Sequence, residues 1–386
     1  MKKILALNNI SKIAENKLKA DYEFSTEVTN PDAIILRSFS MHEYDLPETV
    51  LAVARAGAGT NNIPVADYAK KGVVVFNTPG ANANAVKELV IASLLMSGRK
   101  IVDAIKWADT LKGKGAEVGK LVESGKKAFV GREITGKTLG VIGLGAIGIL
   151  VANAALALGM QVVGYDPYLT TEHALRLDSK VDVVETLDEL MSASDFVTVH
   201  VPFMESTKNT INANNIAKMK KGGAIINLAR GGLVDSSAVI DALASGQLSR
   251  YVTDVPSDDL IGVPNVVAMP HLGASTPEAE DNCAIMAVAE LKDFLENGNI
   301  RNSVNFPACY APRCGASRIT VIHKNEKSVI SAITDVIGKA GCNIENFVSQ
   351  SRGDYAYAIV DTTEVLCDDA VKAISEIPAV IKCRVI

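Results

Sequence analysis

The sequence has few of the features that mark an exported, metal-binding or nucleic-acid-binding protein. Its six cysteines, at positions 283, 309, 314, 342, 367 and 383, form neither a C-x-x-C pair nor a metal-ligand spacing, so we predict no metal site. Lysine and arginine never build a basic block, since Lys126-Lys127 and Lys220-Lys221 are only pairs, and the net charge is −5. Because nucleic-acid binding needs a concentrated basic surface, we predict no nucleic-acid partner.

The first residues give no clear export signal. In "MKKILALNNISKIAENK" two lysines precede an apolar run that is too short for a signal-peptide core, and no small-residue cleavage site follows. We expect a first β-strand over Ile4 to Leu7 instead. Without an export signal the cysteines are expected to stay reduced, and the predicted location is cytoplasmic.

Charge is missing altogether from one long stretch. Thr138 to Tyr165 covers 28 residues without a charged side chain, more than the ~18 that make a candidate membrane span. Glycines at 140, 143, 145, 148, 159 and 164 are a heavy load for a membrane helix. The spacing G-L-G-A-I-G lies between a strand candidate, "LGVIG", and a helix candidate, "AIGILVANAALAL". We therefore predict a dinucleotide-binding loop and no membrane span.

Each glycine of this loop has its own predicted role. Gly143 permits the tight turn, Gly145 lets the pyrophosphate approach the backbone, and Gly148 lets helix pack closely on strand. The helix N-terminus, with Ala146 and Ile147, offers free N–H groups to the phosphates. Asp166 follows Gly148 by 18 positions at the end of the next strand candidate. Its carboxylate would bind the ribose hydroxyls and repel a 2′-phosphate, which predicts NAD as the cofactor.

Two α/β series and a small third module follow from the hydrophobic pattern. Short apolar runs at 33–39, 50–59 and 72–80 indicate a first parallel sheet, and 83–108 reads as one long helix. Six strand candidates after residue 136 indicate a second sheet of the dinucleotide-binding type. A helix over 277–297 leads back toward the first series, and residues 305–317 read as a linker. Residues 317–386, with a helix over 328–340, spell β-α-β-β-α-β, a ferredoxin-like module.

Two residues at strand ends suit hydride-transfer chemistry on a hydroxy acid. His271 ends "NVVAMPH" and precedes Gly-Ala-Ser, where it can act as the acid or base. Arg230 follows the strand "GGAIINLA" and can bind a carboxylate; a surface helix cap is the alternative. His200 ends another strand and is expected to pack against the cofactor, whereas the histidines at 42 and 173 read as surface residues.

Four segments in this order resemble the signatures of the D-2-hydroxyacid dehydrogenases: "GKTLGVIGLGAIG", "VHVP", "INLARGGLVDSSAVIDAL" and "PHLGASTPEAEDN". The resemblance runs from about residue 1 to 306, and the terminal module resembles an ACT domain. It implies an α/β fold of two Rossmann-like or flavodoxin-like parallel-sheet domains and a βαββαβ domain. The implied regions are a substrate-binding domain (1–91 with 276–306), an NAD-binding domain (92–275), a linker (307–316) and an ACT regulatory domain (317–386).

The resemblance places the family's catalytic residues on this sequence. Arg230 and His271 match its arginine and histidine, and Asp259, 29 positions after Arg230, matches its glutamate. The shorter aspartate is a departure, and neighbouring Asp258 could serve instead. Asp254 matches the residue that holds the nicotinamide carboxamide. Further implied NAD contacts are His200, Val201, Pro202, Leu228, Ala229, Arg230, His271 and Gly273.

The substrate residues follow in the same way. Arg37 and Arg55 match arginines that bind phosphate in relatives acting on phosphorylated acids, which predicts a phosphorylated hydroxy acid. The alternative is that they pair with surface carboxylates such as Glu43 or Asp45. Asn82 adds a polar contact, and the 56–59 segment supplies N–H groups to the substrate carboxylate through residues Ala56, Gly57, Ala58 and Gly59.

The terminal module predicts a possible L-serine effector. His323, Asn325 and Asn343 match positions that hold serine in regulated relatives, although Lys327-Ser328 stands where a Pro-Gly pair is common. The alternative is that the module only dimerises the chain, and a homodimer or homotetramer is expected. Rival functions are another D-2-hydroxyacid dehydrogenase acting on hydroxypyruvate, glyoxylate or 2-oxoglutarate, a non-catalytic NAD sensor, and an amino-acid sensor.

Overall fold

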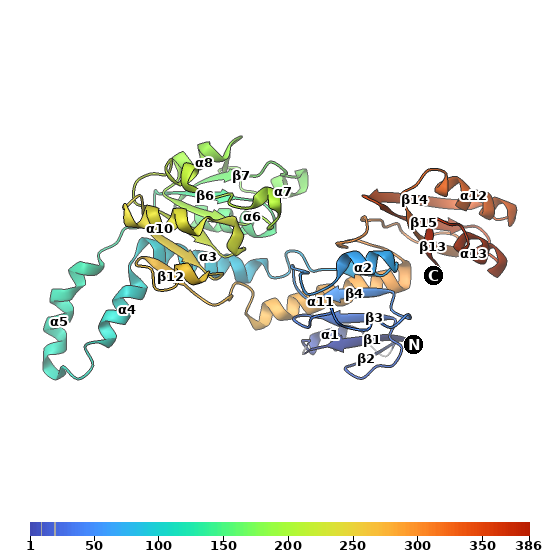
Figure 1. Cartoon of the computed structure of the whole chain (residues 1–386), viewed down its shortest axis with the longest axis horizontal. Helices are drawn as coiled ribbons and strands as arrows, with labels where there is room; N and C mark the ends of the chain where they lie inside the picture. Colours follow the sequence, from blue (N-terminus) through green and yellow to red (C-terminus); the bar gives the residue numbers. More distant parts are fainter. Residues whose placement is uncertain (9, 19–20) are drawn as a thin grey trace. The chain divides into compact units, whose positions relative to one another are not determined.

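The computed structural model describes residues 1–8, 10–18 and 21–386. The chain divides into two compact units, Met1–Asn82 with Pro277–Ile386, and Ala83–Thr276. Each unit is described by itself below (Figure 1). The predicted α/β fold class, with two parallel sheets and a smaller third sheet, is confirmed. The assignment of regions to substrate, cofactor and regulation stays a prediction.

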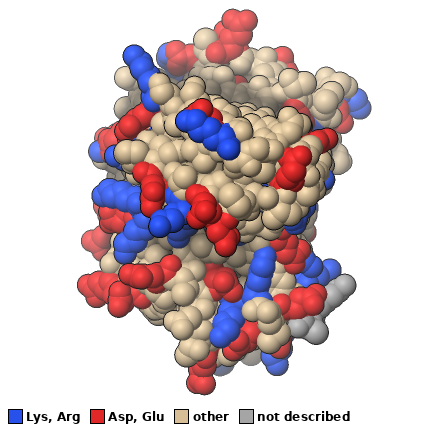
Figure 2. Space-filling model, turned by 90° about the vertical axis from the view of Figure 1, so that its right-hand side faces the viewer, with Lys and Arg blue, Asp and Glu red and all other residues tan. Residues whose placement is uncertain are grey.

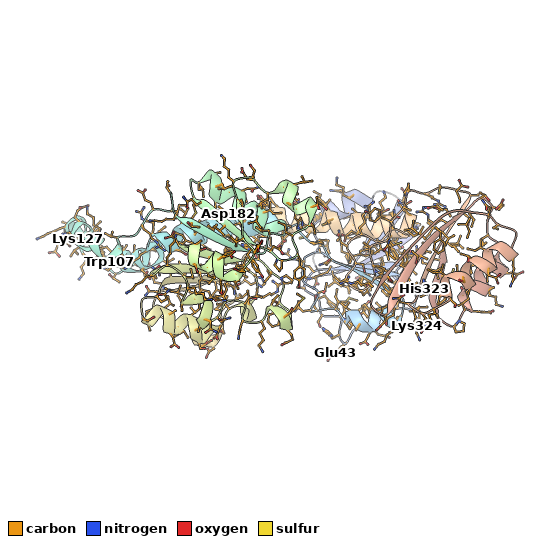
Figure 3. All side chains as sticks on the ribbon, turned by 90° about the horizontal axis from the view of Figure 1, so that it is seen from above. Glu43, Trp107, Lys127, Asp182, His323 and Lys324 are labelled. Atoms are coloured by element: carbon orange, nitrogen blue, oxygen red, sulfur yellow. The ribbon has the colours of Figure 1, made fainter. Side chains whose placement is uncertain are left out.

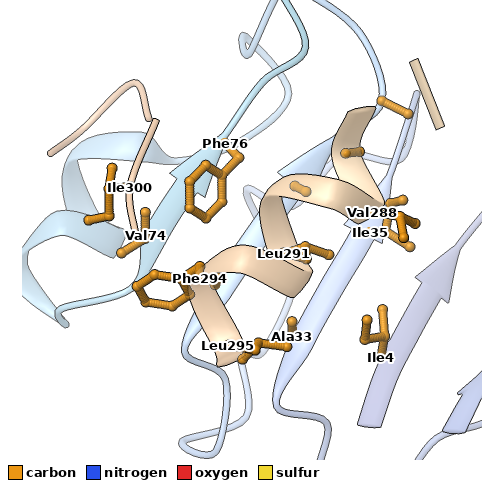
Figure 4. Packing of buried hydrophobic residues seen from close by; sticks show 14 of the residues in the cluster. Ile4, Ala33, Ile35, Val74, Phe76, Val288, Leu291, Phe294, Leu295 and Ile300 are labelled. Carbon is orange, nitrogen blue, oxygen red and sulfur yellow. The ribbon is translucent and has the colours of Figure 1, made fainter. Parts of the chain in front are cut away.

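The first unit begins with a parallel five-stranded sheet in the order β2-β1-β3-β4-β5. Alternate side chains of its strands enter two separate cores, one on each face, because successive residues of a strand point to opposite sides. One face is covered by α11, whose Val288, Leu291 and Phe294 lie over the strands (Figure 4). The elements are β1 (Lys2–Leu7), α1 (Ile13–Leu18), β2 (Tyr22–Ser25), β3 (Ala33–Leu36), β4 (Ala52–Arg55), α2 (Val65–Lys70), β5 (Val74–Phe76) and α11 (Pro277–Asn297).

The second unit contains a parallel seven-stranded sheet in the order β12-β11-β10-β9-β6-β7-β8. The six predicted strands are present, and the seventh, β8, is only two exposed residues long and left no hydrophobic run in the sequence. The strands are β6 (Thr138–Ile142), β7 (Gln161–Tyr165), β8 (Asp182–Val183), β9 (Phe196–Val199), β10 (Gly223–Asn227), β11 (Leu248–Thr253) and β12 (Val266–Ala268).

The sheet of the second unit is packed between helices. The helices are α3 (Ala83–Gly98), α4 (Ile101–Asp109), α5 (Val118–Gly125), α6 (Ala146–Ala157), α7 (Thr171–Arg176), α8 (Leu187–Ala193), α9 (Ala213–Ile216) and α10 (Ser236–Ala244). Short 3₁₀ turns are η2 (Gly115–Glu117), η3 (Lys126–Phe129), η4 (Glu205–Thr207), η5 (Gly231–Leu233) and η6 (Asp258–Leu260).

The prediction of one helix over 83–108 is wrong. The helix stops at Gly98, whose carbonyl accepts a hydrogen bond from the Arg132 N–H at 2.8 Å, so the returning chain takes the place of the next helical turn. The predicted boundary at residue 92 lies inside α3, which belongs to the second unit as a whole because Val86, Val90 and Leu94 enter its core. Beyond the break, α4 and α5 extend away from the sheet as a hairpin that carries Trp107 and Lys127 (Figures 1 and 3).

The terminal module is an antiparallel four-stranded sheet in the order β14-β15-β13-β16 with two helices. This confirms the β-α-β-β-α-β order. Its elements are β13 (Ser317–Lys324), α12 (Val329–Lys339), β14 (Ile344–Arg352), β15 (Tyr355–Thr362), α13 (Asp368–Ser375) and β16 (Val380–Val385). The predicted linker before it is packed rather than free: Phe306 and Cys309 are buried, and Cys309 pairs with Ile300.

Two surface properties bear on function. Among the described residues no helix is both long and apolar enough to cross a bilayer. Acidic and basic side chains are interspersed on the face shown in Figure 2.

Candidate functional site

The carboxyl ends of the parallel strands in the second unit gather most of the predicted residues. Gly143 directly follows β6, Asp166 follows β7, His200 follows β9 and Asp254 follows β11. In an open parallel sheet these ends meet at one edge, where ligands bind. The parallel pairing of these strands therefore places the whole group at one edge of the sheet.

The three glycines of the loop have different surroundings. Gly143 has a φ of +89°, and a Cβ there would lie 2.8 Å from Val201 Cγ1 and 2.9 Å from the His200 carbonyl oxygen. A Cβ on Gly148 would overlap the carbonyl oxygen of Gly143. A Cβ on Gly145 would meet no atom within 4 Å, so the space in front of the α6 N-terminus is open. The loop is therefore closed on its inner side and free on the side where a pyrophosphate would lie.

Asp166 is tied to the glycine loop. One carboxylate oxygen accepts the Leu144 N–H and the other accepts the Tyr168 N–H, both at 2.9 Å. Each oxygen keeps a second lone pair that can accept a ribose hydroxyl. Asp166 thus fixes the loop and remains available to a cofactor.

Asp254 has a buried carboxylate oxygen that a bound ligand could satisfy. Its side chain is 1 % exposed. The Oδ2 atom accepts the Gly273 N–H at 2.9 Å, whereas Oδ1 is buried with no hydrogen-bond partner within the described part of the chain. Buried polar atoms are usually paired. An amide NH₂, as in a nicotinamide carboxamide, would satisfy this oxygen, so the residues present fit NAD.

His200 is held in its neutral form. Its Nε2 lies 3.0 Å from the Thr198 hydroxyl, and Nδ1 is buried with no partner among the described residues. Desolvation by burial lowers the pKa of His200 to about 4. A neutral, buried imidazole suits packing on a cofactor better than proton transfer at neutral pH.

Asn227, which was not predicted as a site residue, holds the loop of Arg230 by hydrogen bonds. The buried Asn227 donates its Nδ2–H to the Arg230 carbonyl at 2.9 Å and accepts the Ala229 N–H at 3.1 Å. Arg230 itself is exposed, and its Nη1 donates to the Ala229 carbonyl at 2.7 Å. The guanidinium is therefore free to turn toward an anion at little cost.

The structure does not join His271 to either candidate acid. Both the histidine and Asp259 are exposed, and across the described ranges no hydrogen bond or ion pair links His271 to Asp258 or Asp259. Asp259 belongs to η6 and borders a pocket of about 600 Å³ whose lining also includes Gly231, Ser236 and Ser257, and does not include His271. The pairing of His271 with an aspartate stays a prediction.

In the first unit, Arg37 and Arg55 come together. They end adjacent strands, with Leu36 opposite Arg55 in the register, and Arg55 Nε donates to the Arg37 carbonyl at 3.2 Å. Arg37 is paired at 2.5 Å with Glu280, in the first turn of α11, rather than with Glu43 or Asp45. Gly57 has a φ of +156°, which residues with a side chain rarely adopt, and the Arg55 guanidinium lies where its Cβ would be.

The other predicted substrate residues of the first unit form one connected loop. Asn77 Nδ2 donates to the Ala58 carbonyl at 2.7 Å, and the Thr78 N–H donates to the Gly57 carbonyl at 3.1 Å. The side-chain oxygens of Thr78 and Asn82 are buried without hydrogen-bond partners in the described part of the chain. Thr78 was not predicted, because a threonine in a turn carries no sequence signal of this kind.

The three residues of the predicted serine site are not gathered within one chain. His323 lies opposite Ala356 on β13, whereas Asn343 lies beside Thr363, past the other end of that strand. Six strand residues separate the two ends, or about 20 Å. His323 is buried with Nε2 unpaired among the described residues, while Asn325 is exposed (Figure 3 labels His323).

Comparison with known proteins gives consistent matches. The family described as D-isomer specific 2-hydroxyacid dehydrogenase, NAD binding domain, matches residues 91–273. The D-3-phosphoglycerate dehydrogenase of Escherichia coli is 34% identical, over 88% of this chain and 82% of that protein. The hydroxypyruvate reductase of Thermotoga maritima is 40% identical, over 69% of this chain and 85% of that protein.

Some relatives are longer. The D-3-phosphoglycerate dehydrogenase of Methanocaldococcus jannaschii is 36% identical over 74% of this chain, which spans only 54% of that protein. Among solved structures, NAD⁺-bound 3-phosphoglycerate dehydrogenase of Entamoeba histolytica superposes with a TM-score of 0.61 at 28% identity, over 78% of this chain and 98% of that one.

Proposed function

Because this chain belongs to the D-isomer-specific 2-hydroxyacid dehydrogenases, an NAD-dependent oxidoreductase family, we propose that it oxidises D-3-phosphoglycerate to 3-phosphohydroxypyruvate, and catalyses the reverse reaction. This would be the first step of L-serine biosynthesis. The observation that carries the choice of substrate is the pair Arg37 and Arg55 at neighbouring strand ends. Guanidinium groups that reach from neighbouring strand ends can bind phosphate oxygens, and a phosphate would compete with Glu280 for Arg37.

The proposed roles divide between the residues as follows. NAD supplies the hydride acceptor when it is bound. Arg230 binds the substrate carboxylate and polarises the C2 oxygen, with help from the N–H groups of Ala58 and Gly59. The Gly57 N–H does not take part, because it donates to the Arg55 carbonyl at 2.8 Å. His271 takes the C2 hydroxyl proton during oxidation and returns it in reduction. Asp259 hydrogen-bonds the other imidazole nitrogen and stabilises the imidazolium, which requires a movement of η6 or of the His271 loop on binding.

The test follows NADH oxidation with 3-phosphohydroxypyruvate and with unphosphorylated hydroxypyruvate. We expect the phosphorylated acid to be preferred by at least tenfold in kcat/KM, and Arg55→Ala to lose that preference while activity on hydroxypyruvate remains. Arg176→Ala, an exposed arginine of α7, is the matched control. Equal or better turnover of hydroxypyruvate by the unaltered chain would instead favour a hydroxypyruvate reductase, the activity named for the Thermotoga relative.

We also propose a homo-oligomer, formed in part through the α4–α5 hairpin. No residue of either helix is buried, and Ile101, Ile105 and Val122 are exposed. Apolar side chains on both helices of an extended arm suit a second copy of the chain. Light scattering should show a dimer or tetramer, and Ile105→Asp should weaken it; a monomeric unaltered chain would refute the proposal.

An L-serine effector and a cytoplasmic location complete the proposal. The unpaired Nε2 of His323 supports a polar ligand at that end of the terminal sheet, with Asn343 contributed by another copy. Six unpaired cysteines suit a reducing compartment. Millimolar L-serine added to the NADH oxidation assay tests the effector site. Inhibition that His323→Ala abolishes supports this site, whereas no inhibition favours a module that only dimerises the chain.

A further inference from the structure

A carboxyl group outside the predicted machinery is buried inside the first unit. Glu290 lies in the middle of α11 and is 7 % exposed. Its Oε1 accepts a hydrogen bond from Asn302 Nδ2 at 2.6 Å, and Oε2 is buried with no hydrogen-bond partner within the described residues. Glutamate is rarely buried unless it is paired, because desolvation of the carboxylate is unfavourable. Packing alone therefore does not explain a glutamate here.

The hydrogen bonds lead from Glu290 to the 57–59 loop. The Asn302 carbonyl accepts the Asn77 N–H at 3.3 Å, and Asn77 Nδ2 in turn donates to the Ala58 carbonyl at 2.7 Å. The Thr78 N–H adds a bond of 3.1 Å to the Gly57 carbonyl. Every step from α11 to this loop is a direct hydrogen bond.

The segment that carries Asn302 is held against β5 on its other side. Ser303 pairs with Phe76, the Val304 N–H donates to the Val75 carbonyl at 2.9 Å, and Asn305 Oδ1 accepts the Val75 N–H at 2.9 Å. Because β5 holds this segment in place, a shift of the Asn302 side chain can alter the position of Asn77.

Burial raises the pKa of Glu290 to about 8, and the Asn302 hydrogen bond opposes this shift. Most contacts of α11 are with α1, β3, β4 and β5. The charged groups of these elements are Glu15 and Lys17, which are exposed on α1, and Arg55 at the end of β4. Lys2 and Arg384 also reach α11, but at its C-terminal end, where both donate to the Leu295 carbonyl. Asp293, one turn along α11, is paired with Arg301 at 3.3 Å. The raised pKa favours the protonated carboxyl of Glu290 at neutral pH, and no ion pair reaches Glu290 among the described residues.

We propose that Glu290 is a positioning residue for the 57–59 loop, acting through Asn302 and Asn77. The inference rests on the proposed function in one respect, because it takes the N–H groups of this loop to bind the substrate carboxylate. Loss of the carboxyl group frees the Asn302 side chain, and the loop then samples positions in which its N–H groups miss the carboxylate. The effect falls on substrate binding and not on NAD binding, whose predicted residues belong to the second unit.

The test compares Glu290→Gln, Glu290→Leu and the unaltered chain, with Glu278→Gln, an exposed glutamate of the same helix, as the matched control. Glutamine can still accept the Asn302 hydrogen bond, whereas leucine fills the volume without it. We expect Glu290→Leu to raise the KM of the hydroxy acid about tenfold with the KM of NAD and kcat little changed, and Glu290→Gln to restore it.

Amide hydrogen exchange of residues 57–59 supplies a readout that needs no turnover. Exchange should be faster in Glu290→Leu than in Glu290→Gln and the control, at equal melting temperature of the rest of the chain. Unchanged exchange and unchanged KM in Glu290→Leu would overturn the inference. If the unaltered chain fails to act on 3-phosphohydroxypyruvate, the proposed substrate is wrong, but the exchange comparison still decides whether Glu290 holds the loop.

Discussion

Gly145 and Gly148 lie one helical turn apart, but a side chain at each position would have a different effect. Gly148 is needed by the fold, because any side chain would overlap the Gly143 carbonyl oxygen. Gly145 faces open space, so the fold tolerates a methyl group there and only a bound pyrophosphate would not. The sequence motif contains both glycines and does not distinguish their roles. The structure indicates that Gly148 is needed for packing and that Gly145 leaves room for a ligand.

This difference gives a paired prediction. Gly145→Ala should keep the melting temperature within a degree or two and raise the KM of NAD at least tenfold. Gly148→Ala should lower the free energy of unfolding by about 1–3 kcal/mol, as overpacking does. Thermal unfolding without cofactor and steady-state kinetics measure the two effects, and normal NAD binding by Gly145→Ala would remove the pyrophosphate from this loop.

Asp259 is the second residue whose role can be tested singly. As partner of the catalytic histidine, its carboxylate should contribute roughly 10²-fold to kcat, within the range for acid–base groups. Asp259→Asn is therefore expected to lower kcat by that amount with little change in the KM of NAD.

Asp258→Asn is the control for this substitution, since the two carboxylates are neighbours in η6. A loss confined to Asp258→Asn would assign the role to the other aspartate. Asp259→Glu, which restores the methylene of the family's glutamate, should retain most of the activity.

At the scale of an element, α11 shows how one helix combines packing with a buried acid. Its apolar residues cover the first sheet, and Glu290 shares that buried side. Because the pKa of Glu290 is raised from 4.5 to about 8, its contribution to folding is fully present below pH 4.5 and is lost as the pH rises through about 8.

The unaltered chain should therefore lose stability relative to Glu290→Gln between about pH 5 and pH 9, by at most roughly 5 kcal/mol. Melting temperatures of both variants across this range measure the difference. Glu278→Gln should follow the unaltered chain, and parallel pH curves for Glu290→Gln and the unaltered chain would contradict the raised pKa.

At the scale of the first unit as a whole, a buried ion pair inside the terminal module orients an arginine that also binds carbonyls outside that module. Arg318 Nε and Nη2 contact Asp361 at 2.6 and 2.7 Å, and both side chains are fully buried. The remaining guanidinium hydrogens reach the carbonyls of Asn297, Ala311 and Pro312. Arg318 thus fastens the end of α11 and the packed linker to the terminal sheet.

Removing one partner leaves a buried charge without compensation, so Asp361→Ala should lower the free energy of unfolding by about 3–5 kcal/mol. The double variant Arg318→Met/Asp361→Leu removes both charges and should recover part of that loss. Denaturant unfolding monitored by hydrogen exchange of residues 317–324 measures both, and an equal loss in the double variant would show that the carbonyl contacts dominate.

The sequence by itself determined that two α/β series are present, most of the strands in both large sheets, the glycine loop with Asp166, the extent of α11 and the terminal β-α-β-β-α-β order. These depend on short-range patterns: apolar periodicity, and turn residues at fixed spacing. Residues at strand ends could also be ranked as site candidates, because parallel strands gather their carboxyl ends at one edge.

Only the tertiary structure decided which polar side chains meet. The break of the helix after Gly98 depends on a carbonyl taken by Arg132, the partner of Arg37 is Glu280 from a segment far along the chain, and Glu290 and Arg318 are buried beside groups that no spacing reveals. Such pairings depend on distances between segments remote in sequence. A sequence pattern gives the hydrophobic periodicity of each segment, but it does not show which other segment packs against it.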